Sequence, residues 1–247
     1  FYELLTGRKI ALGAWIQHIK NAVIEAFRGS GKTTFVTLAY TIWAILGIQQ
    51  KKFVLLLAHT EEQAKQYLAN IKRQLETNEI LRQDLGPFEE SNDEWRATSI
   101  VLPKYGARIT AASIEKHVRG LMHGPHRPQV IICDDLEDLD SVKTAEERKK
   151  LFEWLTGTII PMGEAGLTRL IIIGTNLHRD SLIAKYKSFI VDKKIKGAAV
   201  RSYPIIDENG NPQWLGKFKD KEAIEELRLS RPGGDSVWQR EYLLRII

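Results

Sequence analysis

The stretch EAFRGSGKTTF, residues 25–35, limits the possible folds of this chain more than any other part of it. Its centre follows a short apolar run and precedes a long segment with apolar residues at helical spacing. A strand, a glycine-rich turn and a helix in this order form a loop whose backbone N–H groups surround phosphate oxygens. The lysine reaches the outer phosphates, and the hydroxyl that follows it binds magnesium. We therefore predict a nucleotide site made of Gly29, Ser30, Gly31, Lys32, Thr33 and Thr34.

Position 26 departs from the strict loop pattern G-x-x-x-x-G-K-[ST], because Ala26 stands where the first glycine is expected. That glycine eases the tight exit from the strand. Alanine can make the same exit if its φ angle stays negative. The predicted strand before the loop and the helix after it favour a true phosphate site despite Ala26.

The segment VIICDDLED, residues 130–138, predicts the second half of such a site, a buried strand that ends in carboxylates. Asp134 is positioned to bind magnesium, an ion that keeps part of its water shell. A second carboxylate would orient the attacking water and take its proton. Asp135 has the adjacent position, whereas Glu137 is longer and could reach over from the loop. Both remain candidates.

Strands and helices alternate along most of the chain. Besides the strand at 21–27, apolar runs predict strands at 52–59, 98–103, 107–113, 129–135 and 168–176. Helices are expected at 1–21, 32–47, 60–75, from 144 and after 180, whereas 84–97 reads as irregular. This order predicts an α/β fold with a mostly parallel β-sheet flanked by helices. We expect an ATPase domain over residues 1–197 and a linker-like segment over 198–247.

The composition fits an ordinary globular protein, with 43% hydrophobic and 27% charged residues among 247. The net charge of +5 is compatible with a polyanionic partner, and the densest basic clusters are 193–196 and 149–150. The single cysteine, Cys133, allows no disulfide within the chain and suits a reducing cytoplasm. No apolar run is long enough to span a membrane, so no membrane partner is expected. The chain starts at Phe1 and is expected to be part of a longer protein.

The order of these motifs resembles the ATPase part of the large subunit of tailed-bacteriophage terminases, the motors that package DNA. The resemblance covers about residues 10–245. It rests on AFRGSGKTT, on VRGLMHGPHRPQ leading into VIICDDLED, on IIIGTNLHRDSLI, and on YPIIDENGNPQWLGKF with WQREYLL. It implies a P-loop NTPase of the additional-strand catalytic-glutamate type, with ATP and Mg²⁺ as cofactors. Aspartate at position 135 departs from the commoner glutamate.

The resemblance also implies roles for individual residues. Lys32 and Thr33 would bind the phosphates and the metal, Asp134 the metal, and Arg28 would sense the outer phosphate. Thr175 and Asn176 would couple hydrolysis to motion. Trp15, Gln17 and His18 resemble the element that packs on the adenine. An arginine acting from a neighbouring subunit is also expected, with Arg127 favoured over Arg119.

The function implied is hydrolysis of ATP to translocate double-stranded DNA into a procapsid in the host cell cytoplasm. The implied partners are a portal protein, a small terminase subunit and further copies of the chain in a ring. The nuclease domain of such subunits is not expected in this fragment. Two alternatives remain: a helicase-like ATPase stimulated by nucleic acid, and a non-catalytic module whose interactions depend on nucleotide.

Overall fold

A computed structural model of the chain describes residues 19–88, 94–116 and 118–246. Within these ranges the strands form a single seven-stranded sheet in the order β3-β4-β2-β5-β6-β1-β7. Every neighbouring pair is parallel except β3 with β4. The strands are β1 (Asn21–Ala26), β2 (Phe53–Ala58), β3 (Ser99–Leu102), β4 (Ala107–Ser113), β5 (Val130–Asp134), β6 (Arg169–Gly174) and β7 (Ala198–Tyr203).

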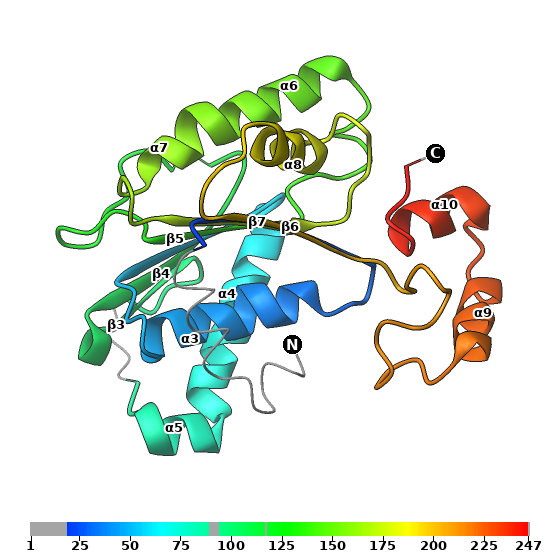
Figure 1. Cartoon of the computed structure of the whole chain (residues 1–247). Coiled ribbons are helices and arrows are strands. Elements are labelled where there is room, and N and C mark those ends of the chain that lie inside the picture. The colour runs from blue at the N-terminus through cyan, green and yellow to red at the C-terminus, as the bar shows by residue number, and fades with distance from the viewer. Residues whose placement is uncertain (1–18, 89–93, 117, 247) are drawn as a thin grey trace.

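Helices cover both faces of this sheet (Figure 1). The π-type helix η1 continues into α3, and together with α4 and α5 they lie on one side. On the opposite side lie α6, η3, α7 and α8. The bounds of these helices are η1 (Thr33–Tyr40), α3 (Thr41–Leu46), α4 (Glu61–Thr77), α5 (Glu79–Leu85), α6 (Ala145–Trp154), η3 (Leu155–Ile159), α7 (Ile160–Met162) and α8 (Leu182–Asp192). The short turn η2 (Pro103–Tyr105) joins β3 to β4.

The central strand β2 explains why the sheet is covered on both faces. All six of its residues, FVLLLA, are buried. Val54 and Leu56 belong to the apolar cluster formed with η1, α3 and α4, whereas Leu55 and Leu57 belong to the cluster formed with α6 and α8. Alternate side chains of a strand point to opposite faces, so an uninterrupted apolar run requires a helical layer on each side.

The sheet order confirms the predicted fold class. Strand β6 lies between β1, which leads into the phosphate loop, and β5, which ends in the acidic pair. An extra strand between these two is the feature that defines the additional-strand type. The helices predicted to start near residues 60 and 144 are also present. Thr60 and Gln63 cap α4 reciprocally, and the Thr144 hydroxyl at the start of α6 accepts from the backbone N–H of Glu147.

Three parts of the structure differ from the sequence prediction. Helix α5 occupies Glu79–Leu85, between the helix expected at 60–75 and the irregular segment expected at 84–97, and the Asn78 side chain caps it. Strand β7 pairs with β1 along its whole length, so the sheet extends past the boundary drawn at residue 197. The rest of the C-terminal part contains α9 (Lys221–Leu229) and α10 (Gly234–Glu241) rather than a plain linker.

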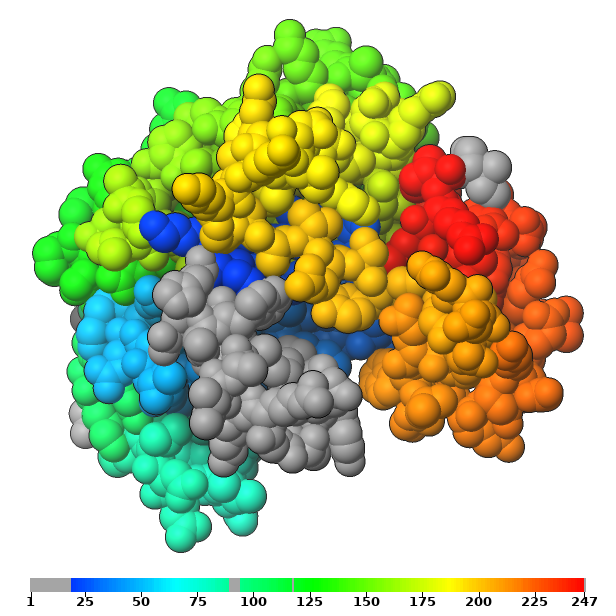
Figure 2. All heavy atoms as spheres, viewed as in Figure 1, coloured from blue at the N-terminus to red at the C-terminus, as the bar shows by residue number. Residues whose placement is uncertain are grey.

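Residues 204–246 form what we call the C-terminal segment, which lies beyond the carboxyl ends of β1 and β7 (Figure 1). In Figure 2 it forms the orange and red part of the surface. It has its own apolar cluster of Ile205, Phe218, Ile224, Trp238 and Tyr242. One member of that cluster, Phe27, comes from the phosphate loop. The segment is therefore packed directly against the start of the loop.

Candidate nucleotide site

The phosphate loop starts where β1 ends. Ala26 is the last residue of β1, it pairs with Tyr203 of β7, and it is not among the residues with a positive φ angle. This meets the condition under which alanine can replace the first glycine of the pattern. The left-handed conformation falls instead on Gly29 and Gly31, whose φ angles are +80° and +78°. Residues other than glycine rarely adopt such φ angles, so glycine is favoured at both positions.

The loop and the end of β5 are joined by side-chain contacts. The ammonium of Lys32 lies 3.2 Å from a carboxylate oxygen of Asp135. The hydroxyl of Thr33 donates to Asp134 Oδ1 at 3.2 Å, and the hydroxyl of Thr37 donates to Asp134 Oδ2 at 2.5 Å. The two halves of the predicted site therefore meet, although they lie about a hundred positions apart in the sequence.

Asp134 is completely buried, and its surroundings control its protonation. Burial, together with the negative charge of Asp135, raises the pKa of Asp134 from 3.8 to about 7. The hydrogen bonds from Thr37 and Thr33 and the charge of Lys32 act in the opposite direction. A cation that approaches this carboxylate would favour its ionised form and release the proton.

The two candidate bases face different neighbours. Asp135 has a φ angle of +45° and faces Lys32 at the surface of the site. Its carboxylate has room there because Gly174 has no side chain, as a Cβ at that position would lie 3.1 Å from Asp135 Oδ1. Glu137 instead accepts a hydrogen bond of 2.7 Å from the backbone N–H of Leu182, at the start of α8.

Glu137 therefore accepts a hydrogen bond at the amino end of α8 in this structure. Burial raises the pKa of Glu137, while the backbone N–H groups of Leu182 and Ile183 lower it. Helix N-termini stabilise carboxylates in this way because their first N–H groups lack partners within the helix. Of the two candidate bases, Asp135 is therefore the one that faces Lys32 of the phosphate loop.

Arg28 and Gly29 of the loop are held by the C-terminal segment. Arg28 Nε donates to Glu241 Oε2 at 2.9 Å, and the backbone N–H of Arg28 donates to the Glu241 carbonyl at 2.8 Å. This ion pair, with an attraction from Asp135, raises the pKa of Arg28. Lys217 donates from its ammonium to the carbonyl oxygen of Gly29 at 2.7 Å. Arg28 is thus engaged by Glu241 in this structure.

The strand tip of β6 lies beside the exit of β1. Thr175 donates from its hydroxyl to the Ala26 carbonyl at 3.4 Å. Asn176 Oδ1 accepts from the Ser181 hydroxyl at 2.7 Å and from the backbone N–H of His178. The pair expected to act in coupling is therefore connected to the phosphate loop on one side and to the start of α8 on the other.

The two arginines considered for a role in trans lie away from the loop. Arg119 donates from Nη2 to the Thr158 hydroxyl at 3.0 Å and is thus bonded to η3. Arg127 is exposed and precedes the amino end of β5, whereas the phosphate loop follows the carboxyl end of β1. Trp15, Gln17 and His18, expected near the adenine, lie outside the described residues.

Three residues of this site were not predicted: Thr37, Lys217 and Glu241. Thr37 lies four positions after Thr33 and therefore on the same helix face, so the helical spacing alone could have suggested it. The other two lie about two hundred residues from the loop, and no local pattern connects them to it.

The residues present fit a bound Mg²⁺. Mg²⁺ prefers oxygen ligands and is usually held by one or two protein groups together with waters and substrate phosphates. The Thr33 hydroxyl and the Asp134 carboxylate supply such oxygens side by side, next to a loop built for phosphate. The described residues contain no cluster of three or more His, Cys, Asp and Glu side chains that could hold a metal by themselves.

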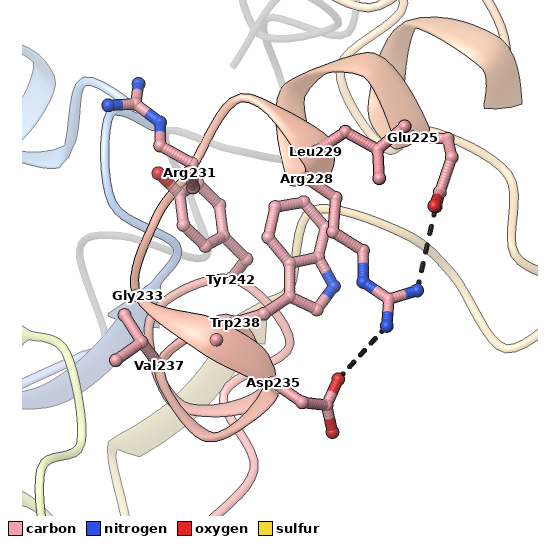
Figure 3. A pocket seen from close by; sticks show the side chains of 10 residues that line it. Glu225, Arg228, Leu229, Arg231, Gly233, Asp235, Val237, Trp238 and Tyr242 are labelled. Atoms are coloured by element: carbon pink, nitrogen blue, oxygen red, sulfur yellow. Dashed lines mark hydrogen bonds and ion pairs between the residues drawn. The ribbon is translucent and has the colours of Figure 1, made fainter.

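A cavity of about 320 Å³ lies away from this site, between α9 and α10 (Figure 3). At its edge Arg228 is paired with Glu225 at 3.6 Å and with Asp235 at 3.2 Å. Trp238 and Tyr242 form its apolar wall.

No helix among the described residues has the length and apolar character needed to cross a membrane.

Comparison with solved structures gives several matches at a probability of 1.00. The large terminase of bacteriophage HK97 has a TM-score of 0.64 and 17% identity, over 92% of this chain and 47% of that chain. The ATPase domain of the Thermus phage P74-26 large terminase gives 0.59 and 14%, over 93% and 89%. An arginine-to-alanine variant of that domain gives 0.62 and 14%, over 100% and 98%.

These likenesses establish the fold, which is that of large-terminase ATPase domains. This chain spans about half the length of the HK97 protein. No curated protein matches the sequence. A protein-family model does match it, over residues 2–152, which include the phosphate loop and the acidic strand end. Since that model spans more than half of the chain, the chain belongs to the family described as "Type III restriction enzyme, res subunit".

Proposed function

We propose that this chain is an ATP-hydrolysing motor domain that translocates double-stranded DNA during viral genome packaging. The observation that carries the proposal is the meeting of the two site halves, Lys32 with Asp135 and Thr33 with Asp134. The terminase-like fold supports the packaging context. The whole assembly, with a portal protein, a small terminase subunit and a ring of copies in the host cytoplasm, belongs to the same proposal.

Each residue has a physical task in this mechanism. The N–H groups of the loop and the Lys32 ammonium would bind the phosphates, while Thr33 and Asp134 would hold Mg²⁺. Bound Mg²⁺ would neutralise negative charge on the phosphates. Asp135 orients the attacking water and accepts its proton, and Lys32 moves from Asp135 to the phosphates when nucleotide enters.

The transition state needs further positive charge, which an arginine from a neighbouring copy would supply. An isolated domain would then hydrolyse ATP slowly. Both arginines are exposed, and Arg127 is the better candidate because the Arg119 guanidinium is already hydrogen-bonded to Thr158. Lys193, Lys194 and Lys196 are candidates for contact with the DNA backbone, which would make binding depend on salt.

The test is the rate of ATP hydrolysis by the assembled motor and by variants. Lys32→Ala and Asp135→Asn should each lower kcat by about 100-fold or more, because each removes a group that acts on the reacting phosphate. Glu137→Gln is the matched control, and it should keep at least about a tenth of the wild-type rate, because its carboxylate faces α8. Full activity of Lys32→Ala would refute the nucleotide site. Loss of activity in Glu137→Gln alone would transfer the role of base to Glu137.

Membership of the restriction-enzyme family favours a second candidate, a helicase-like ATPase stimulated by nucleic acid. A forked DNA duplex with a fluorescent label on one strand distinguishes the two. A packaging motor moves along the duplex without separating its strands, whereas a helicase releases the labelled strand. Release that requires ATP and Lys32 would favour the second candidate.

A further inference from the structure

The Gly29 carbonyl of the phosphate loop has an unusual partner. A loop that turns its N–H groups inward toward phosphate must direct carbonyl oxygens outward, where they need donors. At Gly29 this donor is the ammonium of Lys217, at 2.7 Å. The contact spans 188 positions of sequence and joins the C-terminal segment directly to the backbone of the loop.

The position of Lys217 is fixed by its own surroundings. Its ammonium lies 5.1 Å from the ring centre of Trp214 and 5.5 Å from that of Phe218, within the range of cation–π attraction. A tight turn holds these residues together, because the backbone N–H groups of Lys217 and Phe218 both donate to the Trp214 carbonyl. Phe218 is buried against Phe27 at the start of the loop.

We propose that Lys217 is a positioning residue for the nucleotide phosphates. It holds the Gly29 carbonyl outward, which orients the peptide groups of the loop before nucleotide arrives, and it adds a positive charge beside the bound anion. This inference rests on the proposed function, since it assigns Lys217 to the same nucleotide site. Its effect is on binding of the phosphates, whereas Asp135 acts on the reacting water.

The experiment measures binding of inorganic tripolyphosphate and of ADP, each with Mg²⁺, by titration calorimetry. Lys217→Met keeps most of the side-chain length but removes the charge and the donor, and it should weaken both affinities about tenfold. The KM for ATP should rise by a similar factor while kcat changes less than about twofold. Lys217→Arg keeps the charge and should restore at least half of the lost affinity on the free-energy scale.

Lys219→Met is the matched control. Lys219 lies two positions further along the same segment, is highly exposed and pairs only weakly with Asp220 at 3.7 Å. Its substitution removes the same charge from the segment and should change each affinity less than about twofold. An unchanged tripolyphosphate affinity in Lys217→Met, or an equal loss in Lys219→Met, would overturn the role of Lys217.

Failure of the proposed function itself gives a different result. Lys32→Ala should abolish tripolyphosphate binding if the loop is a phosphate site. If Lys32→Ala binds tripolyphosphate as tightly as the wild type does, the site and the role of Lys217 both fail. If Lys32→Ala loses binding and Lys217→Met retains it, only the role of Lys217 fails.

Discussion

Asp134 is the carboxylate that we propose as a ligand of Mg²⁺, and the fold orients it without a metal. It is buried, it accepts hydrogen bonds from two threonine hydroxyls of one helix, and it lies beside a lysine and a second carboxylate. The hydroxyls fix the orientation of the carboxylate, so no rotamer has to be found when Mg²⁺ binds. Burying the ionised form of this carboxylate costs free energy, so the stability of the protein should depend on pH.

In the unfolded chain Asp134 loses its proton near pH 4, whereas in the folded protein its pKa is about 7. Because the folded form binds this proton more tightly, the resulting stabilisation is complete below about pH 4 and is lost by about pH 7. Without Mg²⁺ and nucleotide, Asp134→Asn should therefore be more stable than the wild type at pH 8, by at least about 1 kcal/mol. This advantage should shrink toward pH 4.5.

Thermal unfolding in EDTA at the two pH values checks this prediction. Asp138→Asn is a control of opposite sign, since hydrogen bonds from Ser141 lower the pKa of Asp138. That control should destabilise the protein at neutral pH, and its effect should fade as the pH falls below the usual range of an aspartate. If the unfolding temperatures of the wild type and of Asp134→Asn changed in parallel with pH, the raised pKa of Asp134 would be contradicted.

At the scale of the elements, local patterns predicted most of the fold. The uninterrupted apolar run of β2 and the capping residues Thr60 and Thr144 each identify their element without help from the rest of the chain. Helix α5 was not predicted because it has only seven residues, and its apolar pair Leu81 and Leu85 is too short a pattern to identify a helix. The pairing of strand β7 with β1 depends on tertiary contacts that sequence periodicity does not contain.

The site could be predicted to a similar extent. The loop and the acidic strand end are local patterns, and they identified Lys32, Thr33, Asp134 and Asp135. The sequence could not separate Asp135 from Glu137, since the difference lies in what each carboxylate faces after folding. Glu137 faces the first N–H groups of α8, which is a contact across 45 positions.

The position of Glu137 predicts a structural role that does not depend on nucleotide. Glu137→Ala should destabilise the protein by about 1–2 kcal/mol, because it leaves buried N–H groups at the start of α8 without an acceptor. Asp135→Asn is the matched control, and it should change stability by less than about 0.5 kcal/mol, since its side chain is partly exposed and asparagine tolerates the positive φ angle at this position. Urea unfolding of the nucleotide-free protein checks both. Equal stability of Glu137→Ala and the wild type would rule out this role.

For the whole molecule, the C-terminal segment and the sheet are connected mainly at the phosphate loop. Phe27 joins the segment's apolar cluster, Arg28 pairs with Glu241, and Gly29 accepts from Lys217. Three successive loop residues therefore contact a part of the chain that follows the sheet. A change in the conformation of the loop would be transmitted to this segment through these contacts, because each of them involves the loop backbone or a side chain next to it.

Glu241 is the most testable of these connections. Its carboxylate is buried and accepts from Arg28 at 2.9 Å and from Arg240 at 3.1 Å. Glu241→Gln keeps the shape but removes the charge between two arginines, at a cost of about 1–2 kcal/mol. Amide hydrogens of residues 204–246 should then exchange about 5–30 times faster, while those of β5 and β6 should not change.

Hydrogen exchange followed by mass spectrometry separates this local effect from general destabilisation. Asp235→Asn is the matched control, since it breaks the pair between Arg228 and Asp235 within the segment and does not touch the loop. Its effect should be several-fold smaller, because both partners are exposed. If Glu241→Gln accelerated exchange equally in β5 and β6, the ion pair would stabilise the domain as a whole. Faster exchange confined to the segment would identify the pair of Arg28 and Glu241 as the contact that holds the segment against the phosphate loop.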